Sequence, residues 1–129
     1  MSTSYLLDSS ILVLFLQKER MIRQRVDQAE TLYVSAIALG ELYYGAEHSK
    51  AALEGLNAVN ALTNTMTVLP VDSPTAKIYG SIKHMQRSKG QMLPDNDLWI
   101  AATAMRYKLT LVARDRHFTW IDGMALEQW

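Results

Sequence analysis

The chain alternates short apolar or β-branched runs with longer helical patterns, and this alternation restricts the fold more than any other feature. Strands are expected at residues 5–7, 31–34, 66–69, 109–112 and 124–126. A strand followed by a helix, repeated with short connections, implies parallel strands joined by right-handed crossovers. The sequence therefore predicts an α/β fold in which functional groups gather at the carboxyl ends of the strands.

Helix boundaries and helical stretches also follow from the sequence. Ser35, directly after the second expected strand, is a typical N-cap for a helix running toward His48. Gly90 suits the position just after a helix that ends at Lys89. Apolar residues at three- and four-residue steps predict three helical stretches, marked by Ile22, Val26 and Ala29, by Leu53, Leu56 and Val59, and by Ile78, Ile82 and Met85.

Size and composition narrow the possible functions. The length of 129 residues suits one domain spanning residues 1–129. The absence of cysteine excludes cysteine nucleophiles and thiolate zinc sites, and with three histidines a metal site must use oxygen ligands. The apolar run at residues 11–16 is too short for a signal peptide or a membrane span, so we expect a cytoplasmic protein with no membrane partner. The net charge of zero leaves RNA binding open, because a local basic rim can surround an acidic site.

Three acids stand near the expected carboxyl ends of strands. Asp8 follows the first strand, Asp115 follows the fourth, and Asp97 lies in the first turn of a helix after Pro94. Taken singly, each has an ordinary structural interpretation as a helix cap, a turn residue or a charge favoured by the helix dipole.

Glu41 is harder to explain as a structural residue. It lies inside SAIALGELYYGA, a helical segment that is apolar or small on nearly all sides, and in projection it falls beside Ile37 and Ala38. No Lys or Arg stands three or four residues away. An unpaired carboxylate in packed surroundings is costly to ionise. Its partner must therefore come from elsewhere in the fold, and a divalent metal is one candidate.

Together, the four acids indicate metal chemistry. In a parallel sheet the strand ends that carry them can converge, and crowded carboxylates repel one another unless they are protonated or bridged by a hard cation. Oxygen-only coordination with open positions suits Mg²⁺ or Mn²⁺, ions that usually act on phosphate substrates. The sequence leaves open whether one ion or two would bind.

Three segments, taken in order, resemble one family. YLLDSSILV, VSAIALGELYYGA and LPDNDLWIAATAMRYKLTLVARDRHF are similar to the PIN-domain ribonucleases, and within them to the VapC-type toxins of type II toxin–antitoxin pairs. The resemblance implies a PIN-like three-layer α/β/α fold with a central, mainly parallel sheet of four to five strands. It also implies Mg²⁺-dependent endonucleolytic cleavage of RNA, either tRNA or other structured or single-stranded RNA. A homodimer and a small cognate antitoxin are the implied protein partners.

The resemblance also implies roles for individual residues. Asp8 and Asp97 correspond to the principal metal ligands, Asp97 being the acid that precedes x-x-Ile-Ala-Ala. Glu41, in ALGELYYG, and Asp115, after Val-x-Arg, would complete the catalytic and metal-binding set and help to hold or activate the attacking water. Ser10 stands where the family places a small polar residue near the metal.

Other residues near these segments are interpreted as structural. Asp95 is expected to be a helix cap, with a bond to a metal-bound water as the alternative. His117 has no visible partner and is interpreted as a surface residue. Arg114 and Arg116 flank Asp115 and are the cations best placed to touch RNA. Four aromatic residues are expected to be core or dimer contacts rather than base-stacking platforms: Tyr43, Tyr44, Trp99 and Trp120.

Two other functions are open to a chain of this pattern. A phosphoacceptor signalling domain would need adjacent acids after the first strand, but Asp8 stands alone, and Asp72 is the one acid near the end of the third strand. A catalytically silent PIN-type module that binds RNA or protein is the other alternative. The presence of all four acids, and of Glu41 above all, argues against it.

Overall fold

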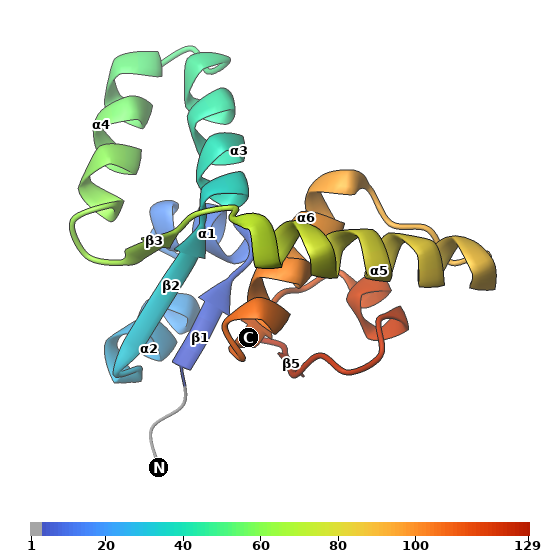
Figure 1. The fold of residues 1–129 in the computed structure, drawn as a ribbon. Coiled ribbons are helices and arrows are strands. Elements are labelled where there is room, and N and C mark those ends of the chain that lie inside the picture. Colours follow the sequence, from blue (N-terminus) through green and yellow to red (C-terminus); the bar gives the residue numbers. More distant parts are fainter. Residues whose placement is uncertain (1–3) are drawn as a thin grey trace.

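The computed structural model describes residues 4–129, and its centre is a five-stranded sheet in the order β3-β2-β1-β4-β5 (Figure 1). All four neighbouring pairs are parallel, with Leu6 opposite Tyr33 on one side and Leu111 on the other. This sheet confirms the predicted α/β fold. The strands are β1 (Ser4–Leu7), β2 (Thr31–Ser35), β3 (Thr67–Leu69), β4 (Thr110–Val112) and β5 (Leu126–Glu127).

Helices connect the strands. They are α1 (Ser9–Leu16), α2 (Arg20–Gln28), α3 (Ala36–Glu47), α4 (Ala52–Leu62), α5 (Ser73–Lys89), α6 (Asp95–Arg106) and the short 3₁₀ helix η1 (Arg116–Trp120). In Figure 1, α3 and α4 stand side by side as a pair that projects beyond the sheet, and α5 packs across α6. Within residues 4–129, none of the helices has the length and apolar character needed to cross a bilayer.

The core lies on both faces of the sheet. Leu6 and Leu7 are neighbours in β1 and both are fully buried, as are Leu111 and Val112 in β4. Because successive residues of a strand point to opposite faces, helices must cover both sides. The arrangement is therefore the three-layer one implied by the resemblance.

Two predicted helix boundaries are confirmed, and one strand is displaced. Ser35 caps α3, because its Oγ accepts a hydrogen bond of 3.0 Å from the backbone N–H of Ala38. Gly90 ends α5 with a φ of 70°, a left-handed conformation that favours glycine. The fifth strand pairs at Leu126–Glu127 instead of residues 124–126.

The two later helical stretches are confirmed as α4 and α5, but each has one exposed apolar residue. Leu53 is 73% exposed and Met85 is 51% exposed, whereas Val59 and Ile82 are buried. In α5 the buried position next to Met85 belongs to Gln86. Its amide donates to the backbone oxygens of Gln91 at 3.1 Å and Trp120 at 3.3 Å, so its polar group is satisfied inside the core.

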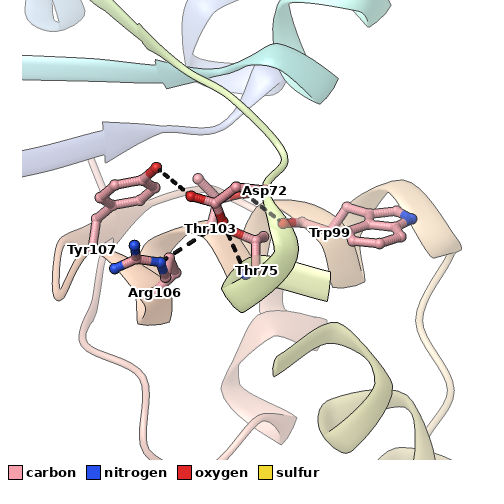
Figure 2. Close-up of polar contacts among 6 residues, drawn as sticks. All are labelled: Asp72, Thr75, Trp99, Thr103, Arg106 and Tyr107. Atoms are coloured by element: carbon pink, nitrogen blue, oxygen red, sulfur yellow. Dashed lines mark hydrogen bonds and ion pairs between the residues drawn. The ribbon is translucent and has the colours of Figure 1, made fainter. Parts of the chain in front are cut away.

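A polar network around Asp72 fastens the start of α5 to the end of α6 (Figure 2). The Asp72 Oδ1 atom accepts hydrogen bonds from the backbone N–H and the hydroxyl of Thr75, and Oδ2 accepts one from the Tyr107 hydroxyl at 3.1 Å. The Arg106 Nε atom lies 3.7 Å from Oδ1. The bonds from Thr75, with the smaller effects of Tyr107 and Arg106, lower the pKa of Asp72. Asp72 is therefore an ionised helix cap that anchors α6.

We predict that Ser35→Ala lowers the free energy of unfolding by about 1–2 kcal/mol, because the first turn of α3 loses a buried acceptor. Urea denaturation at equilibrium measures the change. Ser81→Ala is the matched control, since Ser81 is exposed in the middle of α5 and alanine is the better helix former. Equal stabilities of the two variants would contradict the assignment of Ser35 as a cap.

Candidate metal and catalytic site

The structure brings the four predicted acids to one edge of the sheet. Asp8 follows β1, Glu41 lies in α3 after β2, Asp97 lies in the first turn of α6, and Asp115 follows β4. Since β1, β2 and β4 are parallel neighbours, their carboxyl ends meet at the same edge. The charges of the other three acids all raise the pKa of Asp97, which shows that the four lie within electrostatic reach. We call these four residues the acidic cluster.

The two carboxylate oxygens of Asp8 differ, because one has a structural role and the other is left without a bond in the described chain. It is 4% exposed, and its backbone N–H donates to the Val112 oxygen at 2.9 Å, which fixes it between β1 and β4. Its Oδ2 atom caps α1 by accepting from the Ser10 backbone N–H at 3.4 Å, and it also accepts from the Ser10 hydroxyl at 2.8 Å. The Oδ1 atom is buried and has no hydrogen-bond partner within residues 4–129. Burial raises the pKa of Asp8, the Ser10 bonds oppose this, and the charge of Asp115 adds to it.

Glu41 also has a carboxylate oxygen that forms no hydrogen bond in the described chain. The side chain is half-buried, and its Oε1 atom is buried with no hydrogen-bond partner in the described part of the chain. Burial and then the charge of Asp8 raise the pKa of Glu41, and the nearby Ser9 side chain opposes them. Among residues 4–129, no lysine, arginine or histidine forms a salt bridge with it. The partner that the sequence requires is not a cation of the described chain.

Asp97 is the acid whose ionisation is most disturbed. Burial, followed by the charges of the other three acids, raises its pKa to about 6, and His117 acts in the opposite direction. A carboxyl group with this pKa changes its proton occupancy close to neutral pH.

Asp115 is more exposed and is held by a residue that sequence reasoning had set aside. Its Oδ1 atom accepts from the backbone N–H of His117 at 2.9 Å and lies 3.1 Å from His117 Nδ1. The His117 ring also packs against Trp120. His117 is a surface residue as predicted, but it does have a partner. The Asp-x-His spacing in a turn is the signal that could have indicated this contact.

The expectation that Asp95 caps α6 is wrong. The N-cap position belongs to Pro94, and the Asp95 carboxylate accepts from the Tyr79 hydroxyl at 2.8 Å and from Lys83 Nζ at 3.0 Å. These bonds, from Lys83 first, lower the pKa of Asp95. Asp95 therefore ties α6 to α5 and has a cation of its own, which separates it from the acidic cluster.

The acidic cluster fits a hard divalent cation in its donor chemistry. Within the described part of the chain, no three acidic or histidine side chains lie close enough to coordinate one ion together. Mg²⁺ does not need such a cage, because proteins usually hold it through one or two carboxylates and several waters. The two buried oxygens without partners, on Asp8 and Glu41, are the features that a cation would satisfy.

A cleft of about 480 Å³ adjoins the acidic cluster between α3 and the start of α6, and Glu41 forms part of its wall. Tyr44 and Asn96 line the same cleft, and sequence reasoning assigned neither to the site. Tyr44 is 70% exposed, so it is not a core residue of the single chain, and a dimer contact stays a prediction.

Comparison with known proteins gives close matches along nearly the whole chain. The PIN domain model matches residues 5–123. Ribonuclease VapC2 of Haemophilus influenzae is 30% identical over 128 residues, 97% of each chain. The tRNA(fMet)-specific endonuclease VapC of Salmonella typhimurium is 30% identical over 128 residues, again 97% of each chain. The crystal structure of DNA-bound VapBC from Salmonella typhimurium matches with a TM-score of 0.91 and 30% identity, covering 100% of this chain and 99% of that one.

These matches confirm the resemblance noted in the sequence and the PIN-like form of the fold. They extend over the strands and helices that carry all four acids of the cluster. The chain therefore belongs to the PIN domain family and, within it, to the VapC group.

Proposed function

We propose that this chain is a metal-dependent endoribonuclease, the toxin of a toxin–antitoxin pair, which acts as one domain in the cytoplasm. The observation that carries the proposal is the acidic cluster, in which four segments contribute carboxylates and two buried oxygens have no partner. Relatives named as ribonucleases support the reaction class. A silent binding module would gain nothing from a cluster whose repulsion opposes folding.

In this proposal the four acids have different roles. Asp8 and Asp97 would hold Mg²⁺, or Mn²⁺ in its place, and Glu41 and Asp115 would complete the set. When bound, the ion supplies an activated water and stabilises charge on the phosphodiester. Glu41 and Asp115 would also help to hold or activate the attacking water. Ser10 holds Asp8 so that Oδ1 stays available.

The residues around Asp115 suit an RNA backbone. Arg114 and Arg116 are exposed on either side of it and form no salt bridge within residues 4–129. Phosphate contacts from these two side chains would position the RNA without reading its sequence. The relative named as a tRNA(fMet)-specific endonuclease makes tRNA the first substrate to test.

We also propose two protein partners, a second copy of the chain and a small antitoxin. The VapBC complexes among the solved relatives support the antitoxin. If the proposal is right, adding a purified antitoxin, encoded by a neighbouring gene, stops RNA cleavage at about one equivalent per toxin chain. Cleavage that continues at an excess of a folded antitoxin would contradict that pairing.

We predict that the purified chain cleaves RNA with Mg²⁺ or Mn²⁺ and does not cleave it in EDTA. Asp97→Asn should reduce the cleavage rate by roughly a hundredfold or more, because a metal-binding carboxylate is lost. Cleavage of total tRNA and of single-stranded RNA, followed on denaturing gels, measures this.

Asp95→Asn is the matched control for that experiment, because Asp95 lies two residues away on the same helix but outside the cluster. It should keep most of the activity. Equal losses in the two variants would contradict the separation of the two acids. A folded wild-type chain that cleaves no RNA under any metal condition would favour the silent binding module.

We further predict that Asp97→Asn raises the melting temperature in EDTA at pH 7.5. The folded-state pKa of about 6 lies above the unfolded value of 3.8, so wild-type stability falls as pH rises between these values. The gain from Asn should therefore grow from pH 4 to pH 6 and stay constant above about pH 7. Thermal unfolding across this range measures it, and a variant less stable than wild type at pH 7.5 would contradict the cluster's repulsion.

A further inference from the structure

The cleft beside the acidic cluster lies between α3 and the start of α6. Its lining residues are Ala36, Ile37, Gly40, Glu41, Tyr44 and Asn96. Ala36, Gly40 and Tyr44 follow one another at four-residue steps, so they lie on one face of α3. Asn96 faces them from the first turn of α6, next to Asp97. A group that fills the cleft therefore lies directly beside the acidic cluster.

Gly40 and Tyr44 leave room in the cleft for a ring. A Cβ atom added at Gly40 would meet nothing within 4 Å, so the space above this glycine is open. The exposed Tyr44 ring is supported from within its own helix by His48, whose ring is nearly parallel to it, with an interplanar angle of 12° and centroids 5.8 Å apart. The phenol ring is therefore held as a platform on which another ring can stack.

The charges and hydrogen-bonding groups of the cleft restrict the kind of group that it can bind. Glu41 and the acids behind it repel phosphates and other anions, so an uncharged group fits the cleft best. Asn96 is exposed, and its amide forms no hydrogen bond within residues 4–129. An amide offers both donors and an acceptor, which is what the polar edge of a nucleobase requires.

We propose that this cleft binds one unpaired nucleobase of the RNA, next to the phosphodiester that is cleaved, with Tyr44 stacking on the base and Asn96 bonding to its edge. The proposal rests on the proposed nuclease function and adds to it the residues that hold the base. Bases inside an A-form helix are stacked and cannot enter a cleft, so the preferred RNA has an unpaired nucleotide at the cleavage site. Tyr44 and Asn96 are then the residues that determine base preference.

Two glycines of α3 allow a sharp test. Gly40→Leu fills the cleft, and Gly45→Leu places the same side chain on the same helix outside the cleft lining. Both positions have open space for a Cβ, and leucine is a better helix former than glycine, so both variants should fold at least as well as wild type. Thermal unfolding verifies this before any activity is compared.

Gly40→Leu should raise KM for RNA with an unpaired cleavage site by roughly tenfold or more, the size expected for one lost base stack, with little change in kcat. Tyr44→Ala should do the same, and Asn96→Ala should relax the base preference at the cleavage site. Gly45→Leu should cleave like wild type. If Gly40→Leu cleaves with the KM and base preference of wild type while cleavage still depends on the metal, the base site is wrong and the nuclease stands.

A second measurement does not depend on cleavage. Titration of the wild-type chain with each of the four free nucleosides, followed by NMR, should shift the Asn96 side-chain amide and the Gly40 backbone amide. Gly40→Leu should abolish the Asn96 shift, and Gly45→Leu should keep it. A folded chain that binds nucleosides but cuts no RNA would support the base site and overturn the nuclease. No shift at Asn96 or Gly40 with any nucleoside would overturn the base site.

Discussion

Parallel pairing of β1 with β2 on one side and β4 on the other is the interaction on which the rest of the structure depends. It aligns three carboxyl ends and leaves Asp8 between them, where the Asp8 N–H bonds to Val112. Helices pack on both faces of these strands, so the strand ends cannot shift without disturbing the core. The position of the acids is therefore set by backbone pairing and core packing, and not by attraction among the acids themselves.

The acidic residues show how one side chain can satisfy a structural and a functional interpretation together. Asp8 caps α1 with one oxygen and keeps the other without a partner. Asp115 caps η1 by accepting from the His117 backbone N–H, and its negative charge also raises the pKa of Asp97. Asp95 shows the opposite case, because Lys83 and Tyr79 occupy its carboxylate. Whether an acid near a strand end belongs to the site depends on which neighbours already occupy its oxygens.

The sequence was sufficient for features that depend on local pattern. The alternation of strands and helices and the caps at Ser35 and Gly90 were predicted correctly. The use of the four acids as one site stays a prediction. The failures depend on contacts between elements far apart in sequence. Lys83 reaches Asp95 from another helix. The buried amide of Gln86 donates to the backbone oxygen of nearby Gln91 and to that of distant Trp120. Neither partner can be read from helical periodicity, and the exposure of Tyr44 likewise depends on how α3 packs.

The sheet also ends in a way that limits how other chains can join it. Its two outer strands are short, with three residues in β3 and two in β5, and β3 is followed directly by Pro70. Unpaired backbone at a sheet edge is the template for strand addition and for edge-to-edge aggregation. Edges this short offer few backbone donors and acceptors, so a protein that binds this chain gains little by extending its sheet. Recognition by other proteins is thereby left to the helices and their side chains.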